Sequence, residues 1–222
     1  MEDLIRYAPD LALGFLENIK LSIVGAITSL ILGTILVAMR VSPTPVLRVA
    51  GTFYVNVIRN TPLTLVLAFS ALGLSDQLGL VFSAEPRINS FWIVAMGLSA
   101  YTAAFVCEAL RSGINTVPLG QAEAARAIGL TFMQSLRMII LPQAFRAVVA
   151  PLGSVMIAMI KNTTVAVAGG FAAESAANMK ESFDQVGASI PIFLGIVVAF
   201  MAVTLPVGWF TGRLARRLAV AR

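Results

Sequence analysis

Residues 117–146 of this 222-residue chain read VPLGQAEAARAIGLTFMQSLRMIILPQAFR. The stretch is amphipathic, carries three arginines (Arg126, Arg137 and Arg146), and lies between two strongly apolar segments near 91–110 and 145–171. Such a segment is typical of a loop at a membrane face, where it can contact a partner or the lipid headgroups. We therefore expect a membrane protein in which this loop joins two spanning helices.

The composition agrees with a membrane protein. The chain is 58% hydrophobic and 12% charged, whereas soluble domains carry roughly 25% charged residues. Its net charge is +5, but the basic residues are spread between apolar blocks, which is not the pattern of a nucleic-acid partner. One cysteine and no histidine exclude disulfide frameworks, Cys/His metal sites and histidine catalysis.

Five stretches are long and apolar enough to cross a bilayer as helices, and they predict an all-α integral membrane protein. They cover approximately 21–39, 53–74, 91–110, 145–171 and 190–210. Polar residues interrupt the second and fourth, and Pro62, Pro151 and Pro206 predict local kinks or openings. The second and fourth spans are therefore candidates for lining a pathway. The acidic residues before the first span and the lack of a cleavage site predict that this segment is retained.

The distribution of arginine predicts the topology. Ten arginines fall in 40–48, 111–146 and 213–222, whereas the opposite side has four basic residues and nine carboxylates. The N-terminus is therefore expected outside and the C-terminus in the cytoplasm. This topology places residues 117–146 in the cytoplasm, and one membrane domain accounts for residues 1–222.

The loop itself predicts two short helices that meet at a glycine. Residues 121–128 form the first, and Gly129 can end it in a left-handed conformation. Thr131 and Gln134 have capping-box spacing for a second helix through about Arg137. The alternative interpretation is an amphipathic helix on the bilayer surface, with Arg126 and Arg137 near anionic headgroups.

The spacing within the loop is specific. Glu123-Ala124-Ala125, then Gly129, then Ile139 and Leu141-Pro142 resemble the cytoplasmic coupling loop of importer-type ABC transporter permeases. Arg59-Asn60-Thr61-Pro62, Lys161-Asn162-Thr163-Thr164 and the segment around Glu108 resemble permeases for polar amino acids. The strings NTPLTLV, LRSGINTV, GQAEAARAIGL and KNTT look most like actinobacterial glutamate-uptake permeases, and the resemblance runs from about 15 to 210.

The resemblance implies the five-helix fold of a type I ABC importer permease in the bacterial cytoplasmic membrane. It implies that the loop at about 117–143 contacts the ATPase through Glu123, Ala124, Ala125, Arg126 and Gly129. The implied partners are an ATPase dimer, a second permease chain (a homologue or a copy of this one), an extracytoplasmic solute-binding protein and an amino acid. The sequence has no G-x-x-x-x-G-K-[ST] motif, so this chain needs no cofactor of its own, and ATP and Mg are expected on the ATPase.

The polar residues inside the spans are candidates for the pathway: Arg59, Thr61, Lys161, Asn162 and Thr163. A charge within a bilayer costs about 2.5–3.5 kcal/mol on insertion scales, so both cations should face a cavity or a partner. Their sign favours an anionic ligand. Alternatively, Arg59 satisfies backbone carbonyls freed by a proline, Lys161 pairs with Glu174 or a neighbouring subunit, and the uncharged groups make helix–helix hydrogen bonds.

These residues favour glutamate as the substrate and disfavour arginine, lysine and histidine, because relatives that carry cationic amino acids have acidic side chains near 161–163. Glutamine and aspartate remain open, as does another polar amino acid. Two other classes fit less well. A membrane enzyme needs a nucleophile–base pair or metal site that the spans do not offer, and a self-sufficient carrier or channel would leave the coupling loop unexplained.

Overall fold

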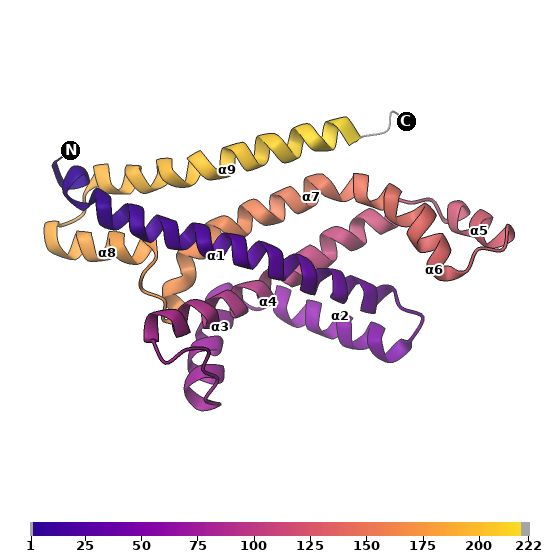
Figure 1. Ribbon diagram of the computed structural model, residues 1–222, viewed down its shortest axis with the longest axis horizontal. Coiled ribbons are helices and arrows are strands. Elements are labelled where there is room, and N and C mark those ends of the chain that lie inside the picture. The colour runs from indigo at the N-terminus through magenta and orange to yellow at the C-terminus, as the bar shows by residue number, and fades with distance from the viewer. Residues whose placement is uncertain (1, 219–222) are drawn as a thin grey trace.

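Long helices form the body of the molecule in the computed structural model, which describes residues 2–218 (Figure 1). Helices α1 (Glu2–Val41), α4 (Pro86–Asn115), α7 (Leu141–Asn162) and α9 (Ile190–Leu218) pack in that order across the bundle. Residues 2–218 contain helices and no strand. Arg222, one of the arginines in the topology prediction, lies outside the described residues.

Within residues 2–218, four helical segments are long and apolar enough to span a membrane, and a bent pair counted as one span supplies the fifth. The pair consists of α2 (Pro45–Arg59) and the segment Leu63–Gln77, which meet at 108°. That second segment comprises α3 (Leu63–Ala68) and the π-helix η1 (Phe69–Gln77). The predicted all-α class, the five apolar segments and the opening near Pro62 are therefore confirmed.

The other two prolines do not break their helices. Pro151 lies inside α7 and Pro206 lies inside α9, and both helices continue through them. Helix α7 is followed directly by the 3-10 helix η3 (Thr163–Gly169), so the fourth predicted span changes its helical winding at the polar motif instead of at the proline. A membrane helix tolerates an interior proline when its neighbours compensate for the missing hydrogen bond.

Two helical regions extend beyond the predicted spans. Helix α1 begins at Glu2 instead of near residue 21, and Tyr7 and Leu11 are buried against Ile192 of α9. Helix α8 (Ser175–Val186) was not predicted. It begins where the Glu174 carboxylate accepts hydrogen bonds from the backbone N–H groups of Ala176 and Ala177, at 2.7 and 2.9 Å. An acidic N-cap of this kind stabilises a helix start.

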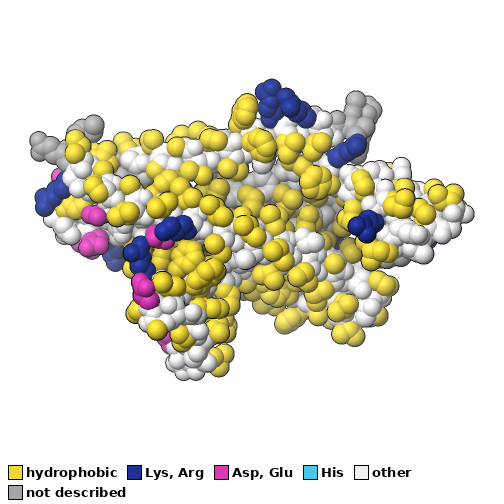
Figure 2. All heavy atoms as spheres, viewed as in Figure 1, with side chains coloured by type: hydrophobic (Ala, Val, Ile, Leu, Met, Phe, Trp, Pro, Cys, Tyr) yellow, Lys and Arg dark blue, Asp and Glu magenta, His cyan; other side chains and the backbone are white. Residues whose placement is uncertain are grey.

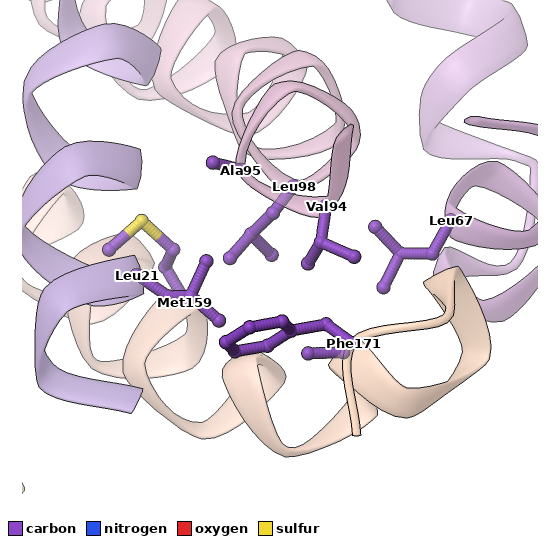
Figure 3. Close-up of a cluster of buried hydrophobic side chains, with 8 residues drawn as sticks. Leu21, Leu67, Val94, Ala95, Leu98, Met159 and Phe171 are labelled. Carbon is purple, nitrogen blue, oxygen red and sulfur yellow. The ribbon is translucent and has the colours of Figure 1, made fainter. Parts of the chain in front are cut away.

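The central core draws together segments that are far apart in the sequence. Leu21 of α1, Leu67 of α3, Leu98 of α4, Met159 of α7 and Phe171 converge on one cluster (Figure 3). Both polar-interrupted segments thus pack against α4. The segments that follow the break after α2 and the change of winding after α7, α3 and η3, contact α4 and also each other.

The two ends of the bundle differ in charge. The turn between α1 and α2, the loop containing α5 and α6, and the described end of α9 lie at one end, whereas α8 and the start of α1 lie at the other (Figure 1). In the view of Figure 2, acidic side chains gather toward the α8 end, and the charged side chains visible at the opposite end are Lys and Arg. Apolar side chains cover much of the surface between them. This arrangement agrees with the predicted topology.

Candidate functional site

The loop folds around Gly129 as a helix–turn–helix unit. Helix α5 (Leu119–Ala127) ends with two hydrogen bonds, from Gly129 N to Arg126 O at 3.0 Å and from Leu130 N to Ala125 O at 3.1 Å. Gly129 has a φ of +85°. This pairing is a Schellman motif, which requires a left-handed residue that glycine adopts readily. The predicted role of Gly129 in ending the first helix is confirmed.

The second helix begins as predicted but extends further. Thr131 N donates to Gln134 Oε1 at 2.9 Å, and Gln134 N donates to Thr131 Oγ1 at 3.3 Å, which is a reciprocal capping box. Helix α6 (Phe132–Ser135) then continues through the π-helix η2 (Leu136–Ile140) into α7. The predicted end near Arg137 is wrong, because the apolar residues after it keep the chain helical into the span. The loop is therefore rigidly joined to α7.

A second contact holds α5 against the start of α7. Gln143 Nε2 donates to Gln121 Oε1 at 3.4 Å and to Ile139 O at 3.0 Å. Ala125 is buried, with 3% of its surface exposed, and faces the neighbouring helical turns. A force applied to α5 would consequently be transmitted to α7 through packed atoms.

The outer surface of the loop is exposed and is not covered by any other described part of the chain. Glu123, Ala124 and Arg126 are exposed. Three apolar side chains share this end of the molecule, with exposed fractions of 82% for Leu119, 77% for Ile128 and 64% for Met133. Exposed apolar side chains beside charged ones are typical of a protein-contact surface. The sequence motif did not single out Leu119 or Met133, although their position beside the motif is a signal for them.

A carboxylate between two arginines lies where α2 ends. Arg40 of α1 pairs with Glu108 of α4, and Arg59 Nη1 lies 3.4 Å from the same Oε1 atom. The Arg40 side chain is 7% exposed and the Arg59 side chain 43%. The three groups carry one net positive charge. Glu108 was not predicted as a partner of Arg59, because their separation in sequence hides the contact.

The polar residues beside Pro62 satisfy the opened backbone. Thr61 Oγ1 donates to Val57 O at 2.8 Å, and Asn60 Nδ2 donates to Asn56 O at 2.7 Å. The alternative prediction, that Arg59 donates hydrogen bonds to the backbone carbonyls freed by Pro62, is therefore wrong. The Arg59 guanidinium instead lies 5.9 Å from the ring centroid of Phe105, within the range of a cation–π contact.

The three candidates at the end of α7 point in different directions. Thr163 is buried, donates to Ile160 O at 2.7 Å and accepts from Asn18 Nδ2 at 3.0 Å. Asn162 lines a cavity between α4 and α7. Lys161 is exposed and forms no ion pair with Glu174 or any other described residue. The suggested Lys161–Glu174 pair is thus absent from the described part of the chain.

The cavity between α4 and α7 has a volume of about 280 Å³. Its polar lining includes Tyr101, Thr102, Ser154 and Asn162, and Phe105 separates it from Arg59. The Thr102 hydroxyl is buried and has no hydrogen-bond partner among the described residues. A buried hydroxyl without a partner costs about 1–3 kcal/mol, so this cavity favours a polar occupant. Sequence reasoning missed Ser154 and Thr102 because both lie in apolar stretches.

Beyond the end of α7, a buried polar cluster holds η3 and α8 to α1. Asn18 Oδ1 accepts from Ser175 N at 2.9 Å, and Asn18 Nδ2 lies 3.4 Å from Glu174 Oε2. Glu174 is fully buried. Burial raises the pKa of Glu174 above its ordinary value, although the donors from Ala176, Asn18 and Ala177 oppose this effect. This cluster fixes the position of the polar motif in α7 and η3.

Comparison with known proteins gives consistent matches. A family model described as binding-protein-dependent transport system inner membrane component matches residues 25–220. The glutamate transport system permease protein GluC of Corynebacterium efficiens is 46% identical over 96% of both chains. The probable glutamine ABC transporter permease protein GlnM of Bacillus subtilis is 33% identical over 88% of both. A crystal structure of an amino acid ABC transporter with histidines superposes with a TM-score of 0.84 at 26% identity, and it covers 96% of both chains.

Proposed function

Because the chain belongs to the family of binding-protein-dependent transport system inner membrane components, we propose that it moves glutamate into the cell as the permease subunit of an ABC importer. The observation that carries the substrate is the 46% identity with a glutamate permease across nearly the whole chain. Two cations on the candidate pathway helices, Arg59 at the end of α2 and Lys161 at the end of α7, also favour an anionic substrate. The chain is a permease and a bacterial inner-membrane protein, and a separate subunit hydrolyses ATP.

The coupling loop would receive the mechanical work. Glu123 can accept a charge-assisted hydrogen bond from a basic group on the ATPase, while Leu119 and Ile128 supply apolar contact. Movement of α5 would act on α7 because Gln121 bonds Gln143. ATP would shift the balance between inward-open and outward-open forms only through a difference in affinity for the two states.

Glutamate would pass beside the positive groups of the pathway. Arg59 is bound to Glu108 through one nitrogen and is 43% exposed, so its guanidinium retains donors for a substrate carboxylate. The amide of Asn162 and the hydroxyl of Ser154 line the adjacent cavity, where they suit the ammonium or the second carboxylate. Lys161 would either face the pathway from the opposite side of α7 or pair with a neighbouring subunit.

The assembly requires further chains. We propose an ATPase dimer that binds ATP and Mg, a second permease chain facing this one, and an extracytoplasmic solute-binding protein. Two permeases around a central cavity would cover part of the apolar surface that the single chain exposes (Figure 2). This chain itself would hold no metal or nucleotide.

Competition for uptake by the reconstituted importer tests the substrate. Labelled glutamate should be displaced by unlabelled glutamate, weakly by aspartate or glutamine, and not by arginine. Arg59→Gln should raise the glutamate concentration needed for half-maximal uptake while leaving complex assembly intact. Stronger displacement by glutamine than by glutamate would favour the glutamine alternative, which the similarity to a glutamine permease supports. Loss of assembly in Arg59→Gln would instead assign Arg59 a structural role.

A further inference from the structure

A second cavity lies at the arginine-rich end of the bundle, away from the candidate pathway. It has a volume of about 510 Å³ and lies where α1, α4, α7 and α9 come together. Val37, Leu110 and Ile114 contribute to its apolar walls, and Arg137 and Arg146 are the only charged residues that line it within the described range 2–218. A volume of this size falls within the range of pockets that bind small ligands, about 300–1,000 Å³.

Neither arginine has a partner in the described part of the chain. Arg137 and Arg146 are exposed and take part in no ion pair or side-chain hydrogen bond there. None of the described residues that line the cavity carries a carboxylate. Two guanidinium groups at the edge of an apolar cavity provide several donors for one phosphate, in the planar geometry that phosphate binding favours.

The position of the cavity favours the phosphate of a lipid over that of a soluble compound. Val37 lies within the apolar segment Asp3–Val41, and Leu110 lies within Pro86–Asn115. Both are close to the ends that carry the cytoplasmic arginines, so the cavity lies at the level of the inner leaflet. Basic pockets between helices at this level bind anionic lipid headgroups. A soluble phosphate compound would leave the apolar walls without a partner.

We propose that this cavity binds an anionic phospholipid, with its phosphate between Arg137 and Arg146 and an acyl chain along Val37, Leu110 and Ile114. Because Arg137 belongs to η2, which continues from the coupling loop into α7, the lipid would brace the helical segment that joins the loop to the membrane. The proposal does not depend on which amino acid is transported.

The test measures lipid binding to the assembled importer in detergent. Native mass spectrometry would compare phosphatidylglycerol with phosphatidylcholine of the same acyl chains. Each arginine near anionic lipid contributes roughly fivefold in affinity, so Arg137→Gln/Arg146→Gln should weaken phosphatidylglycerol binding roughly 30-fold. The matched control Arg48→Gln/Arg216→Gln removes two exposed arginines from the same end but outside the cavity, and it should keep the affinity.

Four results would overturn the proposal. Equal binding of the two lipids would remove the role of charge, and equal losses in the two double variants would show a diffuse surface effect. Competition by glycerol phosphate at the concentration of the lipid would indicate a soluble phosphate ligand. If the isolated chain binds phosphatidylglycerol but the assembled importer does not, the cavity belongs to a subunit interface.

Discussion

Replacing Asn18 with leucine should destabilise the fold, although leucine is more apolar and suits a membrane helix better. Asn18 is 1% exposed, and its amide group bonds Ser175 N, Thr163 Oγ1 and Glu174 Oε2. Leucine has a similar size, so the substitution removes these hydrogen bonds without leaving a large cavity. The attachment of η3 and α8 to α1 depends on them.

The expected loss in the free energy of unfolding is about 3 kcal/mol. An unpaired Ser175 N–H costs about 1–3 kcal/mol, and a lost hydrogen bond to a charged group costs about 1.5–3 kcal/mol. The Glu174 bond is long at 3.4 Å, so its share lies at the low end, and the added apolar contact of leucine offsets part of the total. Thr163 retains its bond to Ile160 O.

The assay is thermal unfolding of the purified chain in detergent. For a protein of this length, about 3 kcal/mol corresponds to a fall in Tm of roughly 6–12 °C. Ser22→Ala is the control, because Ser22 is also buried in α1 but donates only to Asn18 O within its own helix. It should change stability by less than about 1 kcal/mol. Equal Tm values for Asn18→Leu and the wild type would refute the role assigned to this cluster.

Three further predictions concern the loop, the buried carboxylate and the paired arginines. Gly129→Ala should cost about 1–2 kcal/mol of local stability because Gly129 has a φ of +85°. Gly120→Ala, which lies inside α5, should instead stabilise the helix by up to about 1 kcal/mol. Hydrogen exchange of the α5 amides measures both changes, and equal effects would contradict the left-handed turn at Gly129. Burial raises the pKa of Glu174 above 4.5, so its stability contribution is complete below that value and is lost as the pH rises through the folded pKa. The difference in Tm between the wild type and Glu174→Gln, scanned from about pH 4 to about pH 8, should follow this fall, and a flat difference would disprove it. Arg40→Met should destabilise by about 2 kcal/mol because it removes a buried guanidinium from a partly exposed carboxylate. The half-exposed Arg59→Met should cost about 1 kcal/mol or less, and the reverse order in thermal unfolding would show that Glu108 depends mainly on Arg59.

The spans, the topology and the loop could be predicted because their signals are local. Apolar length identifies a spanning helix, and the capping pair Thr131 and Gln134 lies within one turn of α6. Gly129 marked the helix end for the same reason. The family resemblance rested on such short spacings, and the matches confirm it.

The remaining features depend on contacts between distant residues. The first span is predicted to begin near residue 21, whereas α1 begins at Glu2, and its N-terminal part is supported by packing of Tyr7 and Leu11 on Ile192. One alternative from the sequence pairs Glu174 with Lys161, but the Glu174 carboxylate caps α8 and contacts Asn18, which is 156 residues away in the sequence. No periodicity in the sequence specifies such pairs. They follow from the order in which the helices pack.

We propose that a partner ATPase drives this permease through the loop around Glu123. The most direct measurement is ATP-dependent glutamate uptake into proteoliposomes that contain the complete importer, with ATP hydrolysis recorded in parallel. Glu123→Lys should abolish uptake and substrate-stimulated hydrolysis while the chain remains in the membrane. The matched charge reversal Glu181→Lys, which is exposed on α8 at the other end, should leave both unchanged. Glutamate uptake without ATP, or full coupling in Glu123→Lys, would contradict this role of the loop.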